Sequence, residues 1–163
     1  MKKLFFILSG FFLSIWLVSI IHASSAIEYF GEFKNEHIVV HLSNVHAYWF
    51  YRRNNNPVAG SMKKVTVRIQ AREGYQLSTQ TSVIFRNQSY KVNGMNPENN
   101  FYRQGEISFH GSFLPETAIT IEYVYNKPGE TATERLVKKL KLTVPHSPRH
   151  SHDRIEVRLE EIQ

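Results

Sequence analysis

Hydrophobic and polar residues alternate along two neighbouring stretches in the second half of the chain. In the first stretch Ile107, Phe109 and Phe113 share one side, with polar residues on the other. The same alternation returns between Ile119 and Tyr125. A period of two residues indicates a β-strand with one buried face. Because only a short segment containing Pro115 separates the stretches, we predict that they form an antiparallel hairpin.

Other short runs rich in β-branched or aromatic residues are bounded by turn-forming residues. They fall at 37–42, 46–53, 63–71, 81–85, 90–92 and 136–144. Residues 81–85 and 90–92 are close enough to form a second hairpin, and residues 136–144 fit a strand better than the alternative of a short helix. Six to eight short strands without a long helix predict an all-β fold. The expected architecture is an antiparallel, immunoglobulin-like β-sandwich.

The beginning of the chain has the pattern of an export signal. Two lysines precede an apolar run, residues 4–21, which is followed by small residues up to Ala26. We therefore expect a signal-peptide helix in residues 1–26, with cleavage near Ala26. The alternative is an uncleaved anchor, because about 18 apolar residues are the lower limit for crossing a membrane. The β-sandwich domain is expected at 27–145, and a His-rich linker with a charged tail at 146–163.

Either fate of the apolar run places the rest of the chain outside the cytoplasm, since the positively charged end stays inside. The expected location is the periplasm or the exterior of a bacterial cell. If the run is not cleaved, the chain is instead held by a single N-terminal anchor in the inner membrane. Only this second alternative implies contact with a membrane.

Charge and cysteine content narrow the range of partners. The formal charge is +6, and removing Lys2 and Lys3 leaves +4 for the exported part. This mild excess favours a protein or an anionic surface in the envelope as the partner. It does not favour nucleic acid, because no dense basic run is present. With no cysteine, the chain has no disulfide, no Cys-ligated zinc and no cysteine nucleophile.

Catalytic patterns are missing from the sequence. Asp153 is the only aspartate and lies near the C-terminus, and the glutamates fall mostly at predicted turns and strand ends. No nucleophile-elbow, zinc-protease or phosphate-loop motif is present. We therefore predict no catalytic residues and no enzymatic activity.

The run at 46–53 combines aromatic and basic side chains and is the predicted partner-binding site. Its candidate residues are Tyr48, Trp49, Tyr51, Arg52 and Arg53. Alternation sends Trp49 and Tyr51 to one face and Tyr48 to the other, so an exposed face would offer an aromatic anchor beside arginine. The alternative, a central strand buried on both faces, is favoured by the rarity of large exposed apolar patches.

Three histidines in the C-terminal linker are candidate metal ligands. They are His146, His150 and His152. In an extended chain, residues two positions apart are about 7 Å from each other on one side, which suits a shared Cu or Zn ion. The alternative is a polar linker that binds no metal.

Together these patterns predict a non-catalytic interaction module of the bacterial envelope that needs no cofactor. The alternative function is periplasmic binding of Cu or Zn through the His-rich tail.

Overall fold

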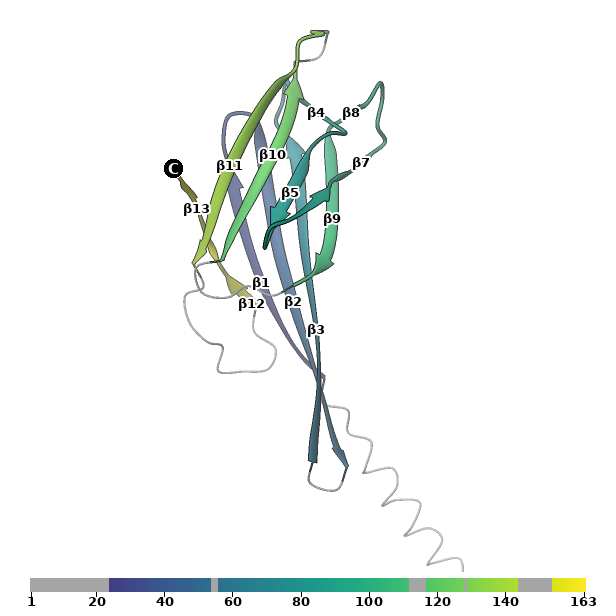
Figure 1. Ribbon diagram of the computed structural model, residues 1–163, viewed down its shortest axis with the longest axis vertical. Helices are drawn as coiled ribbons and strands as arrows, with labels where there is room; N and C mark the ends of the chain where they lie inside the picture. The colour runs from purple at the N-terminus through teal and green to yellow at the C-terminus, as the bar shows by residue number, and fades with distance from the viewer. Residues whose placement is uncertain (1–23, 54–55, 112–116, 128, 144–153) are drawn as a thin grey trace, which may run out of the picture.

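A computed structural model describes residues 24–53, 56–111, 117–127, 129–143 and 154–163 of the chain. Its strands form two sheets that pack against each other (Figure 1). The predicted all-β fold with two layers of mostly antiparallel strands is confirmed. Within these ranges no helix has the length and apolar character needed to cross a membrane.

The first sheet contains six strands. They are β1 (Ser24–Lys34), β2 (Ile38–Arg53), β3 (Asn56–Ala71), β7 (Asn93–Met95), β9 (Gln104–His110) and β12 (Arg154–Glu156). Their order in the sheet is β12-β1-β2-β3-β9-β7. The strands β1, β2 and β3 follow one another as antiparallel neighbours, and β12 runs parallel to β1. The strand that carries the aromatic-basic run, β2, is therefore flanked on both sides.

The second sheet contains seven strands. They are β4 (Gln76–Ser78), β5 (Ser82–Phe85), β6 (Gln88–Lys91), β8 (Phe101–Tyr102), β10 (Ala118–Asn126), β11 (Glu134–Thr143) and β13 (Arg158–Ile162). Their main order is β13-β11-β10-β4-β8, and β5 joins β10 to β6. The strand prediction for residues 136–144 is confirmed by β11. The predicted second hairpin is confirmed by β5 and β6, whose turn residues Arg86 and Asn87 have the positive φ angles of a type I′ turn.

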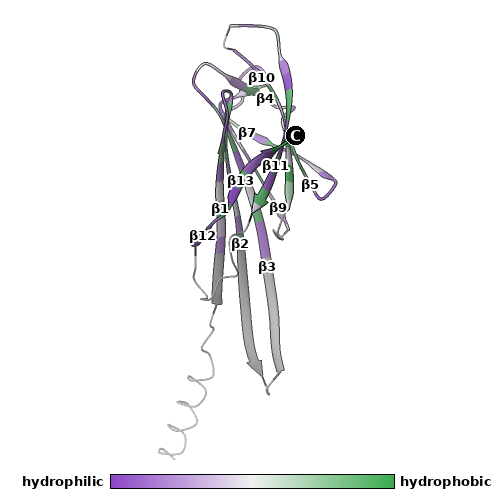
Figure 2. Ribbon diagram, turned by 90° about the vertical axis from the view of Figure 1, so that its left-hand side faces the viewer, coloured by the Kyte–Doolittle hydropathy of each residue, from purple (hydrophilic) through white to green (hydrophobic). Residues whose placement is uncertain are grey.

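The core lies between the two sheets, where alternate side chains of each central strand point inward. The following inward-facing side chains are at most 3% exposed: Ile38, Val40, Leu42, Val65, Val67, Ile69, Ile119, Ile121, Tyr123, Leu140 and Leu142. Figure 2 shows that hydrophobic and hydrophilic segments both occur along the strands of the two sheets. Burying one aliphatic side chain of this size contributes about 1.5–3 kcal/mol, so these strands provide the main stabilisation of the fold.

The predicted hairpin between residues 107–113 and 119–125 is wrong. The strand β9 pairs with β3 in the first sheet, whereas β10 pairs with β11 in the second. The buried faces were predicted correctly, since Phe109 and Ile121 are 8% and 0% exposed; Phe113 lies outside the described residues. Alternation identifies the buried face of a strand but not its neighbour. A connection that crosses between layers therefore gives the same sequence pattern as a hairpin.

The C-terminal segment joins the edges of both sheets. The strand β12 pairs with β1, and β13, two residues later, pairs with β11. Between them Val157 is 2% exposed, and its N–H donates a hydrogen bond to the Phe30 carbonyl at 2.7 Å. This segment therefore closes one side of the sandwich and adds to its core.

Candidate functional site

The predicted partner-binding residues lie in the distal part of the β2–β3 hairpin. We call residues 46–53 and 56–62 the hairpin end. Alongside it, the described part of β1 pairs with β2 up to Ser24–Trp49. On the other side, β9 pairs with β3 up to His110–Lys64, and the Gly111 N–H donates a further hydrogen bond to the Lys63 carbonyl at 3.3 Å. Beyond these pairs, β2 and β3 have only each other as strand partners among the described residues, and Figure 1 shows the two strands extending past the sandwich.

The register sets each candidate residue beside a residue of β3. In this ladder Tyr48, Trp49, Tyr51, Arg52 and Arg53 are opposite Ser61, Gly60, Val58, Pro57 and Asn56, respectively. The structure thus groups the five candidates at one end of one ribbon, with mostly small residues as cross-strand neighbours. Their side chains lie outside the described part of the structure, so their availability to a partner stays a prediction.

The hairpin end and its base carry a uniform charge. Between residues 37 and 72 the sequence has no aspartate or glutamate. The same stretch places Arg52 and Arg53 near the tip and Lys63 and Lys64 near the sandwich. A single-sign cluster on a projecting ribbon attracts acidic partners over roughly the Debye length, about 8 Å at physiological salt.

The predicted metal ligands His146, His150 and His152 lie outside the described residues. Within the described ranges, no three His, Cys, Asp or Glu side chains are grouped as a metal site would require. Copper or zinc binding by the tail therefore stays a prediction.

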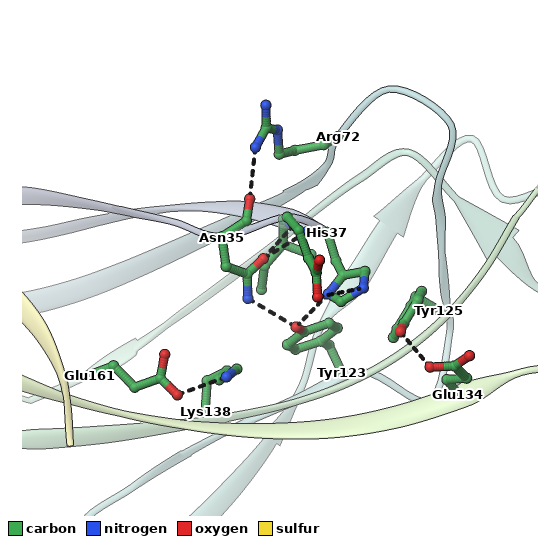
Figure 3. A network of polar contacts seen from close by, with 10 residues as sticks. Asn35, His37, Arg72, Tyr123, Tyr125, Glu134, Lys138 and Glu161 are labelled. Atoms are coloured by element: carbon green, nitrogen blue, oxygen red, sulfur yellow. Dashed lines mark hydrogen bonds and ion pairs between the residues drawn. The ribbon is translucent and has the colours of Figure 1, made fainter. Parts of the chain in front are cut away.

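A buried polar cluster lies where β1 turns into β2 (Figure 3). This turn and the hairpin end are at opposite ends of β2. The Asn35 side-chain oxygen accepts hydrogen bonds from the backbone N–H groups of His37 and Ile38, both at 2.9 Å. The Asn35 amide donates to the Tyr123 hydroxyl at 3.0 Å, and that hydroxyl is 3.3 Å from His37 Nδ1. These contacts fasten the turn of the first sheet to β10 of the second.

Tyrosine rings surround His37 within this cluster. The His37 ring centroid is 4.1 Å from that of Tyr125 and 5.0 Å from that of Tyr75. The Tyr125 hydroxyl donates a hydrogen bond to Glu134 at 2.5 Å. Burial, reinforced by the Glu134 carboxylate, raises the pKa of Tyr125 well above its usual value. Burial also raises the pKa of Tyr123.

These pKa shifts favour a structural role for the cluster. A tyrosine that acts as a base or nucleophile needs a lowered pKa, whereas both shifted phenols stay protonated and act as hydrogen-bond donors or acceptors. The imidazole of His37 is 7% exposed as a residue and is enclosed by aromatic rings. The cluster therefore connects the two sheets without presenting a reactive group to solvent.

A groove of about 490 Å³ runs over the outer face of the first sheet. It is lined by residues of β1, β2, β3 and β12, including Glu32, His41, Arg68 and Arg154. His41 Nδ1 is 3.1 Å from a Glu32 carboxylate oxygen, but both side chains are more than 40% exposed. This Glu–His pair is therefore solvated and does not lie in an enclosed cleft.

Two arginines of the groove are paired with neighbouring glutamates. Arg68 contacts Glu106 at 2.9 Å, and Arg154 contacts Glu28 at 3.3 Å. The hydrogen bond from Lys34 lowers the pKa of Glu32. Exposed pairs of this kind typically contribute no more than about 1 kcal/mol each. The groove is solvated and is lined by both acidic and basic side chains, so its charge does not favour one class of ligand.

Comparison with protein-family models, curated proteins and solved structures found no match for this chain. Its function is therefore inferred from its own sequence and geometry.

Neither the buried cluster nor the groove was predicted from sequence. The cluster depends on the Asn35 side chain, which caps the turn by accepting hydrogen bonds from the backbone. Its position shortly before a β-branched run was the available sequence signal for such a capping side chain. The groove follows from polar residues at alternate positions of β1 and β2. The polar face of β1 was not recognised in the sequence, because Tyr29, Phe30 and Phe33 obscure the alternation of polar and hydrophobic residues there.

Proposed function

We propose that this chain is an exported, non-catalytic interaction module of the bacterial envelope. The partner-contacting element is the hairpin end, through Tyr48, Trp49, Tyr51, Arg52 and Arg53. The observation that carries the proposal is the pairing of β2 with β3 as far as Arg53–Asn56, past the last pairs that β1 and β9 make among the described residues. A ribbon that continues past its sheet costs backbone ordering without adding to the core, which a binding role would explain.

The body of the molecule supports a scaffold role. Its interior is filled by aliphatic and aromatic side chains, and its buried polar cluster joins the two sheets. Rigid scaffolds that present loops or ribbons are a common arrangement for binding proteins. Within the proposal, the chain acts in the periplasm, outside the cell, or from an inner-membrane anchor.

The immunoglobulin-like subtype is part of the same proposal. The immunoglobulin architecture also consists of two packed sheets, and the two mostly antiparallel sheets of this chain support the proposal to that extent. The consecutive placement of β1, β2 and β3 in one sheet departs from the constant-domain order, in which the third strand joins the opposite sheet.

Site-specific photo-cross-linking in intact cells tests the proposal. A photoreactive amino acid replaces Tyr51 at the hairpin end or, as a control, the exposed Arg103 near the opposite end of β9. We expect a discrete adduct from position 51 that position 103 does not give. The proposal fails if position 51 gives no adduct, or if both positions give the same products.

A further inference from the structure

The chain from β7 to the start of β8 contains four asparagines and connects the two sheets. We call residues 93–100 the asparagine loop, after Asn93, Asn96, Asn99 and Asn100. At its start β7 pairs with β9 in the first sheet, and after its end β8 pairs with β4 in the second. The β9 residues beside β7 pair with residues 68–70 near the end of β3, whereas the hairpin end contains the beginning of β3. The asparagine loop and the hairpin end therefore lie toward opposite ends of β3 (Figure 1).

Hydrogen bonds of the backbone fix the shape of this loop. The Glu98 N–H donates to the Phe101 carbonyl at 2.7 Å, and the Phe101 N–H donates to the Glu98 carbonyl at 2.8 Å. Between them Asn99 and Asn100 have φ angles of 49° and 67°, as a type I′ turn requires. The Thr79 N–H, which follows β4, donates to the Asn100 carbonyl at 2.9 Å. The turn is thus formed in the free protein, which lowers the entropic cost of binding a partner.

Tyr102 holds the base of the loop. This residue is 2% exposed, and its ring packs against two glycines, Gly94 and Gly105. A Cβ atom added to Gly105 would be 2.7 Å from the Tyr102 Cε2 atom, and the same ring leaves no room for a Cβ atom on Gly94. Because Gly94 precedes the connection and Tyr102 follows it, their contact joins its two ends. A rigid base of this kind positions the exposed residues between them.

Asparagine, and not glycine, occupies the left-handed positions of the loop. Asn96, Asn99 and Asn100 all have positive φ angles, which glycine adopts without steric cost and other residues only with some. The second central residue of a type I′ turn is most often glycine. Glycine at position 100 would relieve the backbone but remove an amide side chain. Strained positions that persist in this way cluster at ligand-binding sites.

The exposed side chains of the loop suit a protein partner. All four asparagines are exposed, and within the described ranges their side-chain amides have no hydrogen-bond partner. Each amide offers two N–H donors and an acceptor oxygen. Beside them Met95 is 48% exposed, and methionine is an adaptable apolar residue that is enriched at protein-binding surfaces. Glu98 is the only charged residue between 92 and 102, so the loop lacks the basic groups that attract nucleic acid or anionic lipid.

We propose that the asparagine loop is a second interaction surface, which binds a protein by placing Met95 in an apolar pocket and pairing the amides of Asn99 and Asn100 with polar groups of the partner. This inference goes beyond the proposed function, because the loop is separate from the hairpin end. An exported module with one contact surface toward each end of the sandwich can hold two partners at once.

A photoreactive amino acid at position 95 tests the inference in intact cells, and we expect it to give a discrete protein adduct. N99G/N100G fits the backbone of the turn but lacks both amides. We expect it to lower the adduct about tenfold, because two hydrogen bonds of typical net strength correspond to about that factor. N87G is the matched control, since Asn87 is also exposed and has a positive φ of 63° in the turn between β5 and β6. It is expected to leave the adduct unchanged.

A second variant separates loss of contact from loss of fold. N99D/N100D keeps side chains of the same shape that tolerate positive φ angles, but it removes the N–H donors. We expect a similar loss of the adduct. Urea unfolding of the purified chains is expected to give N99G/N100G a midpoint at or above that of the parent, because glycine relieves the left-handed positions.

Three results would overturn the inference. One is that position 95 captures no protein, which includes an adduct that a glycosidase removes and a protease does not. Another is that either double variant keeps the full adduct. The third is that the adduct falls only in variants whose urea midpoint drops below that of the parent. The proposed function is tested separately by the cross-linker at Tyr51, whose adduct these variants are expected to leave unchanged.

Discussion

Gly31 lies directly against Val157. A Cβ atom added to Gly31 would be 2.8 Å from both the Val157 Cγ2 atom and the Val157 carbonyl oxygen. The C-terminal segment passes from one sheet to the other at this point, held by the hydrogen bond from Val157 to Phe30. Only a residue without a side chain lets the crossing segment pack so close to β1.

We expect G31A to lower the free energy of unfolding by about 1–3 kcal/mol, the usual cost of overpacking. Backbone as well as side-chain atoms of Val157 block the new methyl group, so the neighbour cannot simply rotate away. Urea denaturation measures the effect. The control S89A alters an exposed residue of β6 and is expected to stay within about 0.5 kcal/mol of the parent. Equal stability of G31A and the parent would show that the C-terminal segment does not pack here.

The contribution of the C-terminal segment to the core is tested by removing methyl groups. V157A deletes buried groups from a residue that is 2% exposed, and we expect a loss of about 2 kcal/mol from transfer and cavity effects. Val137 on β11 is 59% exposed and gives the matched control V137A, expected within about 0.5 kcal/mol. If both variants lose the same amount, Val157 is not a core residue.

The buried hydroxyl of Tyr123 should also contribute to stability. Y123F leaves the half-buried Asn35 amide without its 3.0 Å partner, and we expect a loss of about 1 kcal/mol, the lower end of the cost of an unsatisfied buried donor. The hydroxyl of Tyr90 bonds to Gln88 at an exposed site, so Y90F makes the same chemical change with an expected loss below about 0.5 kcal/mol. Thermal or urea unfolding compares the two, and a neutral Y123F would contradict the proposed link between the sheets.

Alkaline pH should destabilise the fold through Tyr125. Burial and Glu134 raise the pKa of the folded phenol above 10.0, the value for a free tyrosine. Above pH 10 the unfolded chain therefore loses this proton while the folded chain keeps it, so stability is complete below that pH and falls as the pH rises. One such group changes the unfolding equilibrium constant by at most about tenfold per pH unit.

The variant Y125F isolates this effect from other groups that titrate in the same range. We expect its stability to fall less steeply than that of the parent when urea unfolding is measured from pH 9 to pH 11. Parallel curves for Y125F and the parent would show that the Tyr125 pKa is not raised in the folded chain.

The sequence predicted buried faces well and strand neighbours poorly. Alternation at Val65, Val67 and Ile69 has one explanation, a strand with one face in the core, and these residues are fully buried. The neighbours of β9 and β10 depend instead on contacts distant in the sequence, which no local pattern encodes. For the candidate site, composition identified the aromatic-basic run. Its place at the end of a projecting ribbon depends on the pairing of β2 with β3 as far as Arg53–Asn56, which local sequence does not specify.

The pairing of Ser24 with Trp49 sets the register of β1 at the base of the hairpin end, and a disulfide tests it directly because the chain has no cysteine of its own. Residues directly opposite in an antiparallel ladder have Cα atoms about 4.5–5.5 Å apart, within the range that a disulfide spans. The control S24C/H41C joins positions eight residues out of register, about 26 Å apart.

The deciding measurement is the intact mass of S24C/W49C, purified from the cell envelope under oxidising conditions, before and after thiol alkylation. For chains that retain Ser24, the account predicts one internal disulfide and no thiol to alkylate, whereas S24C/H41C keeps both thiols free. Two thiols that both remain free in S24C/W49C would contradict it.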